Sequence, residues 1–193
     1  GMDGHGSGPC WRRRGKRGEA RAGGEARATV ADLTDPGAAD TVVEATLAAF
    51  GRLDVLVNNA AIVPWIKWDD VDFEEWKRTT SIVLDSVFLC CNAVQRPMRE
   101  AGYGRIVNLS SNTVHFGTEN LAPYVAAKHG IVGVMRSLAN ELAEHDIRVN
   151  TIHPAGVDTP LVAGLGGMNQ FIEQSPTMGP IFMNTMPVEV VDP

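Results

Sequence analysis

Cysteine, aromatic side chains and long apolar runs are all scarce in this 193-residue chain. Cys10 stands alone, and Cys90 and Cys91 are adjacent within one helical pattern. The three cysteines therefore predict neither a disulfide framework nor a metal site, and they favour a reducing cytoplasm. No apolar run has membrane-spanning length, and the N-terminus lacks the apolar core of a signal peptide. A net charge of −6 argues against generic nucleic-acid binding.

The first part of the chain, residues 1–27, predicts an irregular, disordered leader. Residues 11–17 form a basic run between glycine-rich flanks, and no helix or strand periodicity is present. Such a cluster is able to bind nucleic acid, but a solvated tail is the preferred interpretation. With 44% hydrophobic residues overall, residues 28–193 are expected to form one domain, including a flexible substrate lid over residues 161–186.

The pattern with the most chemical content is a serine, a tyrosine and a lysine. Tyr124 and Lys128 are four residues apart in a predicted helix, so both lie on one helix face. Ser111 ends the preceding predicted strand and brings a hydroxyl to the same space. A nearby ammonium favours the phenolate and is expected to lower the pKa of Tyr124, which then exchanges a proton with a substrate oxygen. The predicted roles are acid/base for Tyr124 and oxygen stabilisation for Ser111.

Strands and helices alternate around this pattern. Apolar runs predict strands at residues 29–31, 53–57, 104–111 and 147–152. A helix is expected at residues 40–50, ended by Gly51 and preceded by a cap at residues 34–36. Among the aromatic residues that follow the second of these strands, Phe73 and Trp76 are predicted to pack in the interior, and Trp65 is left open between packing and a substrate wall.

Four signatures in one order make residues 28–193 resemble the short-chain dehydrogenase/reductase superfamily. They are Asp32 with Leu33; Asn58, Asn59, Ala60 and Ala61; the Ser111, Tyr124 and Lys128 set; and the run from Pro154 through Gly156 to Pro160. Residues 151–154 and 184–188 are most similar to its carveol-dehydrogenase-like, mycofactocin-coupled branch.

The resemblance implies an α/β fold, a doubly wound Rossmann-like parallel sheet. Relatives begin with a strand and a Gly-x-x-x-Gly-x-Gly turn that approaches the pyrophosphate of the cofactor. Here Gly4, Gly6 and Gly8 match the spacing of that turn only loosely. The sheet is therefore expected to be incomplete, with its first two strands and its last strand missing.

The resemblance also implies NAD or NADP as cofactor and a secondary alcohol or ketone as substrate. Lys128 would lower the pKa of the tyrosine and hold a cofactor ribose. The implied cofactor-binding residues are Asp32 and Leu33 at the adenine; Asn59, Ala60 and Ala61 by the adenosine ribose; Ile82, Tyr124 and Lys128; and Pro154, Gly156, Val157 and Thr159 toward the nicotinamide. Asp32 read alone is a turn or cap carboxylate, and Thr159 with Pro160 is equally an ordinary helix start.

Three positions depart from the family pattern. Val83 stands where relatives carry an asparagine that steadies a relay water, and Ala61 and Ala155 replace glycines. Valine neither donates nor accepts a hydrogen bond, so a slower enzyme is expected. The alternative is a catalytically impaired remnant that acts only as an oligomerising protein. Relatives pair two helices across a subunit interface, which implies a homodimer or homotetramer. His153 is assigned to a loop or to the substrate lining.

Overall fold

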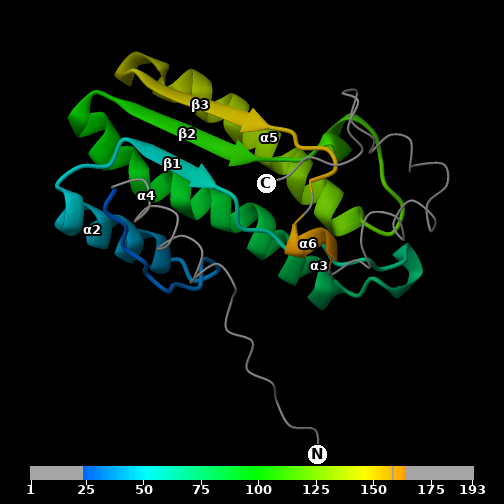
Figure 1. Cartoon of the computed structure of the whole chain (residues 1–193). Coiled ribbons are helices and arrows are strands. Elements are labelled where there is room, and N and C mark those ends of the chain that lie inside the picture. The colour runs from blue at the N-terminus through cyan, green and yellow to red at the C-terminus, as the bar shows by residue number, and fades with distance from the viewer. Residues whose placement is uncertain (1–23, 158, 164–193) are drawn as a thin grey trace, which may run out of the picture.

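The computed structural model describes residues 24–157 and 159–163 (Figure 1). Residues 1–23 of the expected leader, Asp158 and residues 164–193, which hold most of the expected lid, lie outside this part of the chain. The described helices and turns, in chain order, are α2 (Ala38–Phe50), η1 (Trp68–Asp70), α3 (Phe73–Thr80), η2 (Ser81–Asp85), α4 (Ser86–Ala101), η3 (Asn112–His115), α5 (Ala122–Leu142), η4 (Ala143–His145) and α6 (Pro160–Ala163).

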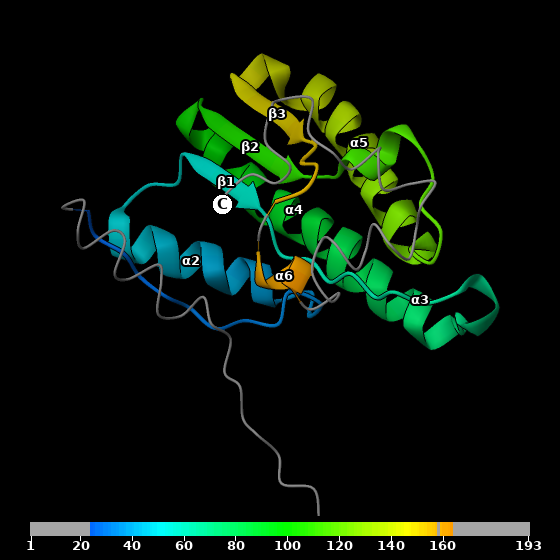
Figure 2. The ribbon, with the colours of Figure 1, turned by 45° about the vertical axis from the view of Figure 1, so that its right-hand side comes forward.

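The described strands form one parallel sheet. They are β1 (Val55–Asn58), β2 (Gly104–Leu109) and β3 (Ile147–Ile152), in the order β1-β2-β3. Helices α4 and α5 pack on one face of this sheet, and α2 lies beside α4 (Figures 1 and 2). The prediction of a Rossmann-like α/β fold with a parallel sheet is confirmed, and three of the four predicted strands are present.

The sheet has one buried face and one exposed face. Ile106 and Val149 point toward α4 and α5 and are almost fully buried. Val55 and Val57 alternate with half-buried positions along β1 and are 55% and 56% exposed. Side chains alternate between the two faces of a strand, so these valines mark the face that no described helix covers.

The prediction of a strand at residues 29–31 is wrong. No strand forms there, and Val30 is 63% exposed. A three-residue segment makes too few contacts to hold as a strand unless it pairs with a neighbour. The following residues form a turn instead, in which Oδ1 of Asp32 accepts hydrogen bonds from the backbone N–H and the hydroxyl of Thr34 at 3.0 and 2.7 Å. The interpretation of Asp32 as a turn carboxylate is confirmed.

Helix α2 ends at Gly51 as expected, but its N-cap lies after residues 34–36, where the cap was predicted. Gly51 has φ = 72°, the left-handed conformation that glycine adopts at low cost, and its N–H bonds to the carbonyl of Leu47. The helix begins at Ala38 with Gly37 as its N-cap. Asp35 therefore lies outside the helix, where its carboxylate accepts a hydrogen bond from the N–H of Gly37.

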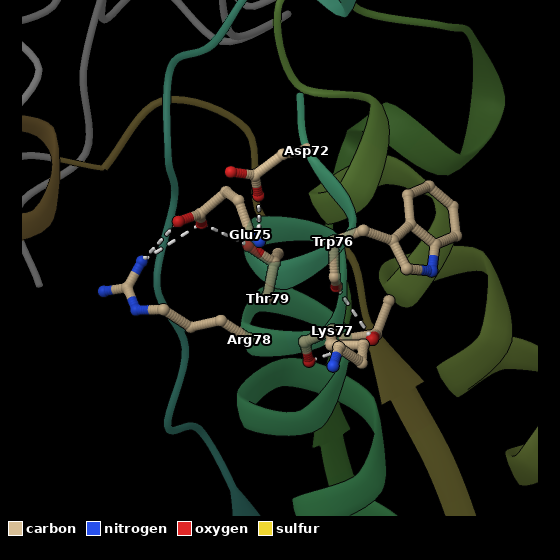
Figure 3. A network of polar contacts seen from close by, with 7 residues as sticks. Asp72, Glu75, Trp76, Lys77, Arg78 and Thr79 are labelled. Carbon is tan, nitrogen blue, oxygen red and sulfur yellow. Dashed lines mark hydrogen bonds and ion pairs between the residues drawn. The ribbon is translucent and has the colours of Figure 1, made fainter. Parts of the chain in front are cut away.

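Helix α3 is stabilised by a polar network on its own surface (Figure 3). Asp72 caps the helix by accepting a hydrogen bond from the N–H of Glu75 at 2.8 Å. Glu75 then binds the guanidinium of Arg78 and accepts a hydrogen bond from the buried hydroxyl of Thr79. The prediction that Phe73 packs in the interior is wrong: its ring is 70% exposed and lies under the ammonium of Lys77, because its helix position faces solvent.

Helix α3 continues into α4 through the π-helical turn η2. Val83 lies in this turn and is fully buried in the apolar core with Val87, Ile131 and Leu121. A π turn inserts one extra residue into a helix and is frequent near functional sites. The residue in the position of the family's asparagine thus contributes apolar packing.

Two glycines of α5 provide a matched test of its packing on η2. A methyl group at Gly130 would lie 2.7 Å from Cδ2 of Leu84, whereas one at Gly133 would contact nothing within 4 Å. We expect Gly133→Ala to stabilise the fold by up to ~1 kcal/mol because alanine is the better helix former. Gly130→Ala should be less stable than Gly133→Ala by ~1–3 kcal/mol because of overpacking. Urea denaturation measures both, and equal stability of the two variants would contradict this packing.

Candidate active site

The site lies at the carboxyl edge of the parallel sheet. All three strands end there, so the residues that follow them, Asn59, Ser110 and His153, meet at one edge. Two backbone hydrogen bonds hold the chain after β2 to the chain after β3. The N–H of Ser110 binds the carbonyl of Ile152 at 2.8 Å, and the N–H of Asn112 binds that of Pro154 at 3.0 Å.

The hydroxyl of Ser111 both accepts and donates a hydrogen bond within the turn that follows β2. Ser111 is the N-cap of η3, where its Oγ accepts a hydrogen bond from the N–H of Thr113 at 3.2 Å. The hydroxyl also has one hydrogen to donate, and it donates it to Oδ1 of Asn112 at 3.4 Å. The side chain is 7% exposed.

Tyr124 lies in the first turn of α5, as the sequence predicts. The side chain is buried, and burial raises its pKa because the low-dielectric surroundings disfavour the phenolate. A hydrogen bond with the hydroxyl of Ser111 opposes this rise in the pKa. The two hydroxyls are therefore brought together, as the sequence predicts.

Lys128 lies one turn further along the same face of α5. Its ammonium donates a hydrogen bond to the carbonyl of Leu109 at 2.5 Å and lies 5.5 Å from the centre of the Tyr124 ring. The residue is only 3% exposed, and burial lowers the pKa of its ammonium to about 8. The hydroxyl of Ser110 binds the backbone carbonyl of Lys128 at 3.1 Å.

The expected direction of the tyrosine pKa is corrected by this geometry. The sequence predicts a pKa lowered by Lys128, but burial raises the pKa of Tyr124. The ammonium lies over the ring and is bound to the carbonyl of Leu109. Desolvation of the phenolate therefore exceeds the attraction of the cation.

The other expected cofactor residues differ in how far they are exposed to solvent. Asn59 and Ala60 are exposed after β1, while Ala61 packs against the core. Gly156 is buried, and Ile82, Pro154, Val157 and Thr159 are half-buried. Asp32 and Leu33 lie in the turn before α2, and α6 begins at Pro160, so the helix-start interpretation of that position is confirmed.

Two further polar groups shape the site but were not singled out from the sequence. They are the carbonyl of Leu109 and the hydroxyl of Ser110. The sequence assigned His153 to a loop or to the substrate lining, and its imidazole binds the carbonyl of Ser111. Backbone carbonyls carry no sequence signal. Ser110 was visible only as the neighbour of Ser111, and the partners of His153 depend on contacts across the sheet edge.

The donor set fits the ribose of a nicotinamide dinucleotide. An ammonium has three donors, and Leu109 uses one of those on Lys128, which leaves donors for a pair of ribose hydroxyls. In the described part of the chain, no group of three or more histidine, cysteine or acidic residues is arranged to hold a metal ion. Cys90 and Cys91 are free thiols, and burial raises the pKa of Cys91 to about 12.

The chain resembles known proteins across most of its length. A protein-family model described as enoyl-(acyl carrier protein) reductase matches residues 12–192. The trans-4-hydroxycyclohexanecarboxylate dehydrogenase of Sinomonas cyclohexanicum is 43% identical over 69% of this chain and 51% of its own length. The 3-alpha-(or 20-beta)-hydroxysteroid dehydrogenase of Mycobacterium tuberculosis is 41% identical over 76% of this chain and 56% of its own length.

A solved structure agrees with these matches. The acetoin dehydrogenase of Enterobacter cloacae is 38% identical, with a TM-score of 0.69 over 74% of this chain and 57% of its own. Fold and site together define an α/β protein with a parallel sheet and a Tyr/Lys helix beside a strand-end serine. The chain belongs to the short-chain dehydrogenase/reductase superfamily. It spans about half the length of the curated relatives it matches.

Proposed function

We propose that this protein is an NAD- or NADP-dependent oxidoreductase that interconverts a secondary alcohol and a ketone. The observation that carries the proposal is the placement of Tyr124 and Lys128 on one face of α5, with the buried ammonium 5.5 Å from the centre of the tyrosine ring and Ser111 at the start of the turn after β2. This arrangement lies at the carboxyl edge of the sheet, where α/β proteins bind their ligands. The dehydrogenase names of the relatives support the same reaction class.

Tyr124 exchanges the proton in this proposal. Its pKa is raised by burial, so the phenol is protonated at neutral pH and donates to the oxygen of a ketone as that oxygen gains negative charge. In the reverse direction the phenolate that this transfer leaves takes the proton of the alcohol and becomes the phenol again. Ser111 donates its hydroxyl hydrogen to the same substrate oxygen, in exchange for its long 3.4 Å bond to Oδ1 of Asn112.

Lys128 would hold the cofactor ribose. Leu109 fixes the ammonium in position, and the remaining donors are free to bind ribose hydroxyls. The nicotinamide ring, when bound, accepts or supplies the hydride. The other proposed cofactor contacts are those named above: Asp32, Leu33, Asn59, Ala60, Ala61, Ile82, Tyr124, Pro154, Gly156, Val157 and Thr159.

The substrate we propose is a cyclic secondary alcohol. Two of the relatives carry ring alcohols in their names, a hydroxycyclohexanecarboxylate and a hydroxysteroid.

Among the described residues, no helix has the length and apolar character needed to cross a membrane. The cytoplasm remains the proposed location.

We also propose a homodimer or homotetramer. Phe88 on α4 is 56% exposed, and phenylalanine is enriched at the centre of subunit interfaces. The competing hypothesis of a non-catalytic oligomerising protein rests on Ala61, Ala155 and the fully buried Val83.

A turnover assay tests the proposed reaction. The purified chain is mixed with NAD⁺ or NADP⁺ and a panel of substituted cyclohexanols and hydroxysteroids, and the absorbance of the reduced nicotinamide is followed. We expect turnover with at least one ring alcohol, and a loss of ~10²-fold or more in Ser111→Ala because the oxygen loses a donor. Ser137→Ala, at an exposed position of α5, is the matched control. A folded chain without turnover would favour the non-catalytic hypothesis.

A further inference from the structure

His153 lies where the chain leaves β3, directly beside the serine of the site. Its Nδ1 is 3.2 Å from the backbone carbonyl oxygen of Ser111, and its Nε2 is 2.9 Å from the hydroxyl of Thr151. A carbonyl oxygen only accepts, so Nδ1 carries the hydrogen and donates it. In the neutral ring Nε2 then accepts from Thr151, and this pair of bonds fixes both the tautomer and the ring orientation.

The bond to Ser111 completes a set of contacts between the chain after β2 and the chain after β3. On either side of it, the N–H of Ser110 binds the carbonyl of Ile152, and the N–H of Asn112 binds that of Pro154. The carbonyl of Ser111 lies between these two backbone bonds. It accepts from the imidazole at 3.2 Å and from the N–H of Val114 in η3 at 3.3 Å, so among the described residues the imidazole is its one partner from the chain after β3. The ring of His115 packs against that of His153, with centroids 5.2 Å apart, and limits its rotation.

The carbonyl and the hydroxyl of Ser111 are carried by the same backbone position. The Oγ accepts from the N–H of Thr113 and donates to Oδ1 of Asn112, and it lies beside the hydroxyl of Tyr124. A displacement of the Ser111 backbone would move both the N-cap and the hydroxyl relative to Tyr124. Catalytic groups displaced by ~1 Å typically lose up to ~10²-fold in rate.

We propose that His153 is a positioning residue that holds Ser111 in its catalytic orientation through the Nδ1–H bond to the serine carbonyl. This inference rests on the proposed function. Both ring nitrogens are bound to protein groups, so the imidazole acts through Ser111 and contacts no reacting atom.

A matched pair of substitutions separates this role from simple packing. The amide nitrogen of asparagine comes close to the place of Nδ1, whereas the longer glutamine places its amide near Nε2. We expect His153→Asn to retain kcat within ~3-fold, and His153→Gln to lose ~10–100-fold in kcat with little change in KM. Equal losses in both variants, or a loss confined to KM, would overturn the proposal.

A second measurement does not depend on turnover. Long-range ¹H–¹⁵N NMR of the neutral imidazole at pH 9 should show His153 with the hydrogen on Nδ1, the less common tautomer in solution. A hydrogen on Nε2 would overturn the inference even if the enzyme is active. The Nδ1–H tautomer in a chain without turnover would leave the contact standing and refute the proposed function instead.

Discussion

Tyr124→Phe is expected to lower kcat by about 10²–10⁴-fold with almost no change in the thermal unfolding midpoint. The substitution removes only the hydroxyl that exchanges the proton with the substrate oxygen. The ring remains buried in the core and remains under the ammonium of Lys128. Steady-state kinetics with a ring alcohol, together with a calorimetric melt, measure both quantities.

Tyr103→Phe is the matched control for this prediction. The chain has two tyrosines, and Tyr103 is 38% exposed beside Arg105, before β2. Loss of its hydroxyl should leave kcat unchanged. Comparable kinetics for the two variants would remove the tyrosine from the mechanism and leave the site without its acid/base.

Lys128→Met is expected to abolish activity and to remove a pH dependence of stability. The pKa of Lys128 is about 8 in the folded chain and 10.5 when the side chain is unperturbed. Between these values the unfolded chain binds more protons, so the free energy of unfolding rises with pH through this window. The rise is on the order of 3 kcal/mol for a shift of this size. It is lost again as the pH falls through about 8.

The difference in the free energy of unfolding between the wild type and Lys128→Met, followed against pH, isolates the contribution of the lysine. Titrating groups distant from Lys128 are present in both and cancel when urea denaturation of the variant is subtracted from that of the wild type. The pKa of Tyr124, the nearest such group, is raised above its ordinary value of 10.0, so its own titration falls at the upper end of the window. Methionine fills a similar volume without a charge, so we expect a folded variant whose stability lacks this rise. A rise of equal size in both proteins would show that Lys128 titrates as an exposed lysine and is not desolvated.

Local spacing was enough to predict much of the fold and the arrangement of the candidate site. The four-residue separation of Tyr124 and Lys128 places both on one helix face because the helix period requires it, and α5 confirms this. Gly51 predicted the end of α2 because glycine accepts a positive φ. The apolar runs of β1, β2 and β3 were clear because strands buried on a helix layer need them.

The features that local spacing did not predict depend on contacts between distant segments. Residues 29–31 have strand-like composition but pair with no strand of the described residues, so composition alone was misleading. The ammonium of Lys128 is held by a backbone carbonyl 19 residues away, and His153 binds one 42 residues away. The raised pKa of Tyr124 reflects burial, which a helix pattern does not measure.

Titration of the purified chain with NADH and NADPH by isothermal calorimetry tests the central claim most directly, with Lys128→Met measured in parallel. The account predicts saturable binding of one or both dinucleotides, weakened by ~10-fold or more in the variant because the ribose loses its charged donor. Absence of binding by a folded wild-type chain, or equal affinity in the two proteins, would contradict it. The chain would then contain Ser111, Tyr124 and Lys128 in this arrangement without using them to bind a dinucleotide.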